Sequence, residues 1–128
     1  MKKIEYSTEE LIDITRWLKV ISEPNRLLLL EKIIEGVQCN CELGSVLNIA
    51  PNLISHHLSV LREAGLIEAE RDPIDARWIY FSVNTKAMDE FRLFFDGFFN
   101  SERTQPRRLS CGPHVTEEQR KSFVRMVK

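Results

Sequence analysis

The chain has three cysteines, and two of them, Cys39 and Cys41, are separated by one residue in the stretch VQCNCELGSVL. Thiolates are soft donors, so a site built from cysteines selects soft ions over magnesium or manganese. Both thiols lie where a short helix is expected to begin, and the positive end of a helix dipole is expected to lower their pKa. The alternative interpretation makes them small buried residues with a packing role.

Length and composition limit what can surround these thiols. A chain of 128 residues with a net charge of −1 suits one domain with an additional arm. An odd number of cysteines without an export signal argues against a disulfide framework, and no stretch approaches the roughly 18 apolar residues of a membrane span. These features predict a cytoplasmic protein without a membrane partner. The near-neutral charge does not by itself favour a nucleic-acid partner.

Capping residues and apolar periodicity predict four helices in the first half of the chain. They span about residues 8–21, 24–35, 41–48 and 51–64. Ser7 and Glu10 form the expected capping box of the first helix, and Pro51 and Gly65 bound the fourth. Because only a few residues separate the third and fourth helices, they must cross steeply, as in a helix-turn-helix.

The remainder predicts a hairpin, a fifth helix and an arm. The stretch LIEAERDPIDARWIYFSVN alternates about a turn at Pro73, as a β-hairpin does. A helix from about Lys86 then carries five of the seven phenylalanines, a face wide enough to meet a second copy. We therefore predict a mainly α winged helix-turn-helix homodimer. Residues 1–100 would form the DNA-binding and dimerisation domain, and residues 101–128 an arm with a short amphipathic helix that carries Cys111.

The fourth helix has one apolar face and one polar face. Candidate DNA contacts are Asn52, Ser55, His56, Ser59 and Arg62, with Arg77 from the hairpin. Asn pairs well with adenine, and short polar side chains reach bases or phosphates from the first half of a recognition helix. Two alternatives stay open: a merely solvated face, and a protein-interaction module. Asp72 and Asp75 in the hairpin turn are expected to repel phosphate.

At this point the runs SHHLSVLREAGLI, EPNRLLLL and CNCEL resemble the ArsR/SmtB family of metal-responsive repressors over about residues 8–100. The resemblance implies a winged-helix dimer that leaves double-stranded operator DNA when an inducer binds. Arsenic- and cadmium-sensing branches carry Cys-x-Cys followed by an acidic and an apolar residue at this helix, where Cys39 and Cys41 stand. The fifth helix lacks the histidine of zinc-sensing members, and the further cysteine of the arsenic sensor is missing after Cys41.

Three thiolates are what arsenic(III) or antimony(III) requires, so the predicted metal ligands are Cys39, Cys41 and Cys111. Adding His114 would give a Cys3His site for cadmium, lead or zinc. A thiol redox switch, with Cys111 as the resolving cysteine, is a further alternative. An enzyme is not expected, because the chain has no Gly-rich phosphate loop and no catalytic triad or carboxylate pair.

Overall fold

The computed structural model describes residues 4–108, 112–113, 116–118 and 121. Cys111, His114 and most of the predicted last helix lie outside these residues, although Glu117, Glu118 and Lys121 are helical. The elements are α1 (Thr8–Ile21), α2 (Pro24–Ile34), α3 (Asn40–Leu47), α4 (Pro51–Glu63), β1 (Ile67–Arg71), β2 (Ile79–Val83), α5 (Thr85–Phe98) and the 3-10 turn η1 (Ser101–Arg103).

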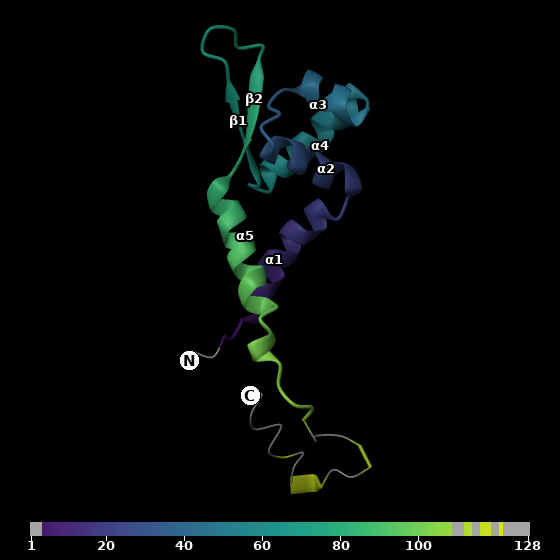
Figure 1. The fold of residues 1–128 in the computed structure, drawn as a ribbon, viewed down its shortest axis with the longest axis vertical. Helices are drawn as coiled ribbons and strands as arrows, with labels where there is room; N and C mark the ends of the chain where they lie inside the picture. The colour runs from purple at the N-terminus through teal and green to yellow at the C-terminus, as the bar shows by residue number, and fades with distance from the viewer. Residues whose placement is uncertain (1–3, 109–111, 114–115, 119–120, 122–128) are drawn as a thin grey trace.

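The molecule is elongated (Figure 1). Helices α2, α3 and α4 cluster at one end, and the hairpin of β1 and β2 projects beside them. Helices α1 and α5 approach each other below this cluster, and η1 follows α5 at the end remote from α3. This arrangement of five helices and a two-stranded hairpin confirms the predicted mainly α winged helix-turn-helix fold.

Local signals account for the helix boundaries. Ser7 and Glu10 form the capping box of α1 as predicted. Helix α3 begins at Asn40 and ends at Leu47, one residue earlier at each end than predicted. The reason is Asn48, whose positive φ of 53° places it in the left-handed region and closes the helix. Helix α5 likewise begins at Thr85, because the Asn84 side chain accepts a hydrogen bond from the Ala87 amide.

The core lies where α2, α3, α4 and the hairpin meet. Leu29, Leu43, Ile54, Leu61 and Leu66 are all completely buried. Each contributes about 1.5–3 kcal/mol to folding relative to an exposed side chain. The apolar face of α4 is therefore committed to packing against α2 and α3, which fixes its polar face toward solvent.

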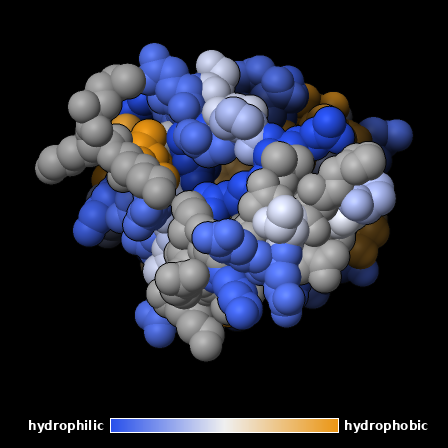
Figure 2. All heavy atoms as spheres, turned by 90° about the horizontal axis from the view of Figure 1, so that it is seen from below, coloured by the Kyte–Doolittle hydropathy of each residue, from blue (hydrophilic) through white to orange (hydrophobic). Residues whose placement is uncertain are grey.

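Aromatic contacts join α1 to α5. The Trp17 indole stacks on Phe91 with ring centroids 5.4 Å apart and donates a hydrogen bond of 2.9 Å to the Ala64 carbonyl. Other apolar side chains of α5 and its C-cap stay uncovered, since Leu93 is 61% and the C-cap residue Phe99 is 70% exposed. From the end where the arm leaves, the surface is largely hydrophilic with separate hydrophobic patches at its margins (Figure 2). Among the described residues, no helix has the length and apolar character to cross a membrane.

Candidate nucleic-acid interface and thiol site

Helix α4 is divided into two faces. Its buried residues are Ile54, His57, Leu58 and Leu61. The five candidate DNA contacts on this helix, Asn52, Ser55, His56, Ser59 and Arg62, are all exposed. His56 and His57 are split between surface and core, as expected for adjacent residues about 100° apart on a helix. The structure thus brings these five side chains together on one solvent-facing surface.

The start of α4 is suited to anions. Ala50 precedes it and gives its first amides no side-chain hydrogen bond, and Pro51 occupies the first turn. The positive end of the helix dipole favours a phosphate at this position. The charged contact Arg62 lies near the other end of the helix, so the surface can touch a duplex at two separated points.

The charges of the hairpin turn are engaged with each other. The Arg77 guanidinium donates two hydrogen bonds to the Asp75 carboxylate, at 3.0 and 2.8 Å. Arg77 lowers the pKa of Asp75, and Asp75 in turn raises that of Arg77. The pairing with Arg77 largely offsets the repulsion of phosphate that Asp75 is expected to cause. Arg77 in turn is less available to contact a phosphate, because its guanidinium is already bonded to Asp75.

The two thiols lie together at the start of α3. Cys39 is the N-cap residue, its Sγ is 3.2 Å from the Cys41 Sγ, and Glu42 Oε2 is 3.8 Å from the Cys39 Sγ. Cys39 is half-buried and Cys41 is exposed. The interpretation of this pair as buried packing residues is therefore wrong.

The pKa expected for Cys39 is also wrong in direction. Its pKa is raised above the ordinary value of 9.0, chiefly by the hydrogen bond with the Cys41 thiol and also by partial burial and the nearby Glu42 carboxylate. A backbone hydrogen bond at Glu42 acts in the opposite direction without reversing the result. The effect of the helix dipole on Cys39 is outweighed because the neighbouring Cys41 sulfur lies within hydrogen-bond distance. Cys39 therefore keeps its proton at neutral pH.

A hollow of about 510 Å³ opens beside the thiols. It is lined by Cys39, Asn40 and Cys41 from the start of α3 and by Arg77, Trp78 and Ile79 from the hairpin. The position of Trp78 near the cysteines could not be predicted from the sequence, because a contact between α3 and the hairpin depends on the tertiary arrangement. A group bound by the thiols would therefore also contact the hairpin near its turn, where β2 begins.

Two hydrogen bonds connect residues 38–41, which include both thiols, to α4 and β2. The Asn40 side-chain amide lies 3.3 Å from the Ser55 hydroxyl on α4 and donates to it. The Phe81 amide on β2 donates a bond of 2.8 Å to the Gln38 carbonyl, just before Cys39. Neither Gln38 nor Asn40 was predicted as a functional residue, although the position of Asn40 between the two cysteines is a signal that the sequence carries.

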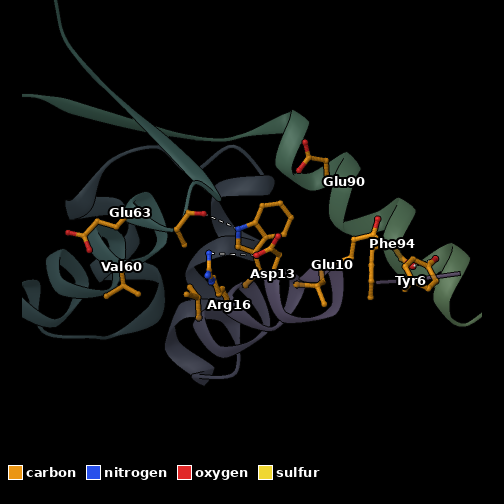
Figure 3. Close-up of a pocket in the computed structure, with 12 residues that line it drawn as sticks. Tyr6, Glu10, Asp13, Arg16, Val60, Glu63, Glu90 and Phe94 are labelled. Atoms are coloured by element: carbon orange, nitrogen blue, oxygen red, sulfur yellow. Dashed lines mark hydrogen bonds and ion pairs between the residues drawn. The ribbon is translucent and has the colours of Figure 1, made fainter. Parts of the chain in front are cut away.

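A second hollow, of about 940 Å³, lies between α1, α4 and α5 (Figure 3). Trp17, Ile14 and Phe94 contribute apolar surface to it, and Glu10, Asp13, Glu63 and Glu90 contribute carboxylates. Figure 3 shows labelled lining side chains on three helices: Glu10 and Asp13 on α1, Val60 and Glu63 on α4, and Glu90 and Phe94 on α5. This second hollow has no cysteine in its lining and is separate from the thiol site.

Within the described part of the chain, no three or more His, Cys, Asp or Glu side chains are grouped so as to hold a metal ion. The predicted third thiolate, Cys111, and the alternative ligand His114 lie outside that part. The described residues therefore supply two of the three predicted thiolates, close enough to bind one ion together.

A polar recognition face, a steeply crossed helix pair and an adjacent hairpin define a winged helix-turn-helix DNA-binding protein. The family model described as "Bacterial regulatory protein, arsR family" matches residues 23–69. The transcriptional repressor SdpR of Bacillus subtilis is 30% identical over 82 residues, 64% of this chain and 88% of that protein. The chain therefore belongs to the ArsR family. It is a DNA-binding transcriptional repressor of that family and not an enzyme, as predicted.

Two further relatives carry names that refer to metals. The cadmium resistance transcriptional regulatory protein CadC of Listeria innocua is 23% identical over 62% of this chain and 66% of that protein. A solved structure described as a possible transcriptional regulator for arsenical resistance has a TM-score of 0.56 and 31% identity, and covers 67% of this chain and 86% of that one. Both of these proteins are thus named for resistance to a metal or metalloid.

Proposed function

We propose that the protein represses transcription from an operator and releases it when a thiophilic ion, arsenic(III) or antimony(III), binds Cys39, Cys41 and Cys111. The observation that carries the proposal is the 3.2 Å separation of the Cys39 and Cys41 sulfurs, with both thiols accessible. Soft thiolates at this separation suit one soft ion. Two relatives named for cadmium and arsenical resistance support it further.

The proposed binding step exchanges oxygen for sulfur. Arsenous acid carries three hydroxyl groups; three protein thiols form three arsenic–sulfur bonds, and three waters leave with the thiol protons. Arsenic stays in the +3 state, so the step needs no oxidant or reductant. It begins from neutral thiols, which agrees with a Cys39 pKa raised above 9.0.

The DNA-facing part of the proposal assigns contacts to the exposed face of α4. The assigned residues are Asn52, Ser55, His56, Ser59 and Arg62, with Arg77 from the wing. Arg77 makes the smaller contribution, because a phosphate must compete with Asp75 for its guanidinium. The Asn52 amide supplies the bidentate pattern that reads adenine.

A route from the thiols to this face follows from the two hydrogen bonds. An ion that draws Cys39 and Cys41 toward Cys111 of the arm shifts the start of α3, and with it the Asn40 bond to Ser55 and the Gln38 bond to β2. A tenfold loss of DNA affinity requires the ion to favour the released conformation by only about 1.4 kcal/mol.

Homodimerisation belongs to the same proposal. Leu93 on α5, Phe99 at the C-cap of α5 and Ile12 on α1 are 61%, 70% and 51% exposed, which is apolar surface for a second copy to cover. Residues 1–100 would form the DNA-binding and dimerisation unit, and the arm would bring Cys111 to the site from its own or the second chain. The protein would act in the cytoplasm, where its operator lies.

Cadmium, lead or zinc at a Cys3His site that includes His114 is the second candidate, favoured by the likeness to CadC. Native mass spectrometry of the reduced dimer separates the candidates. We expect one arsenic per chain, lost in Cys39→Ser and in Cys111→Ser but retained in His114→Ala. Loss of the ion in His114→Ala would favour the four-ligand site. A disulfide to Cys111 that forms with peroxide, in a protein that takes up no ion, would favour the redox switch.

A further inference from the structure

The tip of the wing presents an apolar side chain to solvent. Ile74 is 96% exposed, the highest value among the exposed large hydrophobic side chains, and it follows Pro73, which is also exposed. Figure 1 shows the turn between β1 and β2 projecting beyond α3 and α4, at the end of the molecule remote from the arm. An isoleucine in this position contributes nothing to the core.

The turn that carries Ile74 is nevertheless firmly organised. One Asp72 carboxylate oxygen accepts hydrogen bonds from the amides of Ile74 and Asp75, at 2.8 and 2.9 Å. The other oxygen accepts a bond of 2.9 Å from the Tyr80 hydroxyl. Because β2 thus anchors the carboxylate, the backbone at Ile74 is held in place and its side chain is directed outward before any partner binds.

The charged side chains around the tip are engaged within the hairpin. Arg77 pairs with Asp75, and the Arg71 guanidinium donates a bond of 2.8 Å to the Ala76 carbonyl. Two arginines and two aspartates, Asp72 and Asp75, give residues 71–77 a formal charge of zero. The tip therefore offers a phosphate little net attraction, and its distinctive feature is the apolar side chain.

We infer that Ile74 enters the DNA minor groove as an apolar contact when α4 occupies the adjacent major groove. Isoleucine and proline are among the side chains that proteins insert into the minor groove, where they contact sugars or wedge between base steps. The inference rests on the DNA-binding function and is independent of the inducer. It makes Ile74, rather than an arginine, the principal wing contact.

The test compares wild-type protein with Ile74→Ala by fluorescence anisotropy, on a labelled duplex from the region upstream of its own gene. Loss of the apolar contact should weaken binding about tenfold. The slope of log affinity against log salt should stay unchanged, because no phosphate contact is removed. Ile34→Ala, an equally simple truncation at a 57% exposed position on α2, should bind like wild type. The melting temperatures of both variants should match that of wild type.

A second duplex, with uracil in place of thymine, identifies the groove. This change removes the thymine methyl from the major groove only, so the tenfold difference between wild type and Ile74→Ala should persist. Its disappearance would place Ile74 against a thymine methyl and overturn the assignment. Equal affinities of wild type and Ile74→Ala, or a reduced salt slope in the variant, would also overturn it. Failure of wild type to bind any upstream duplex would instead count against DNA binding itself.

Discussion

The side-chain amide of Asn40, the residue between the two cysteines, donates a hydrogen bond of 3.3 Å to the Ser55 hydroxyl on the DNA-facing surface of α4. The atoms proposed to bind the inducer and those proposed to contact DNA are therefore joined by one side chain. Because Ser55 is itself exposed, a shift of Asn40 changes a surface that a duplex would touch, and no large domain motion is needed.

The first prediction concerns this bond. Asn40→Ala should bind arsenite with an affinity within about twofold of wild type, because both thiols remain. Arsenite lowers the affinity for DNA, and the factor by which it does so should be about three- to tenfold smaller in Asn40→Ala than in wild type. A factor of this size corresponds to the usual free energy of one hydrogen bond. Ser45→Ala, at an exposed position of the same helix, serves as the control and should respond like wild type. An unchanged arsenite response in Asn40→Ala would rule out this route.

The second prediction concerns pH. The pKa of Cys39 is raised above its ordinary value, chiefly by the hydrogen bond with the Cys41 thiol, so the thiol is protonated at neutral pH in the free protein. Cadmium must displace thiol protons, so its affinity should rise by up to about tenfold per pH unit for each proton released. Arsenous acid consumes those protons as water, so its affinity should stay nearly constant between about pH 6.5 and 8. Titration of the DNA-free protein, followed by the fluorescence of nearby Trp78, measures both.

A cadmium affinity that levels off near neutral pH would contradict this prediction. It would mean that Cys39 is already a thiolate there, as the dipole argument alone expects.

Much of the fold could be predicted because its signals are local. The capping box at Ser7 and Glu10, Pro51 at the start of α4 and the alternation around Pro73 each depend on a few neighbouring residues. The polar face of α4 follows from periodicity in the same way. These features needed no knowledge of distant contacts.

The parts that could not be predicted depend on distant residues or on side-chain rotamers. The hollow beside the thiols forms because Trp78 lies near Cys41 in the folded chain. The Phe81 amide donates a hydrogen bond to the Gln38 carbonyl, which is more than forty residues away in the sequence. The sulfur–sulfur contact likewise depends on side-chain rotamers and not on spacing alone. The direction of the Cys39 pKa and the engaged state of Arg77 follow from such contacts.

The third prediction concerns stability. Trp17→Phe keeps a ring to pack on Phe91 but removes the indole N–H that bonds to the Ala64 carbonyl. Loss of this hydrogen bond leaves the Ala64 carbonyl without its indole donor. It should lower the free energy of unfolding by about 1 kcal/mol and the melting temperature by about 3 °C. Trp78→Phe is the matched control, since that side chain is 48% exposed, and it should change the melting temperature little. Equal shifts in both variants would show that the bond to Ala64 is not stabilising.

The fourth prediction concerns the third thiolate. The described part of the arm, up to Arg108, lies at the end of the molecule remote from α3 (Figure 1). Mixed dimers of Cys39→Ser and Cys111→Ser chains test which chain supplies Cys111. If the arm crosses the dimer, half of the mixed dimers' sites keep all three thiols and arsenite release is partly restored. If each chain closes its own site, mixing restores nothing.

The central claim is that arsenite releases this protein from DNA through its thiols. The most direct measurement is the anisotropy of a labelled duplex from the region upstream of its gene, saturated with reduced protein and then titrated in parallel with arsenite, cadmium and zinc. We predict release by arsenite in wild type, and retention of DNA by Cys39→Ser, Cys41→Ser and Cys111→Ser at the same arsenite concentration. Normal release of the Cys39→Ser protein by arsenite would contradict the account.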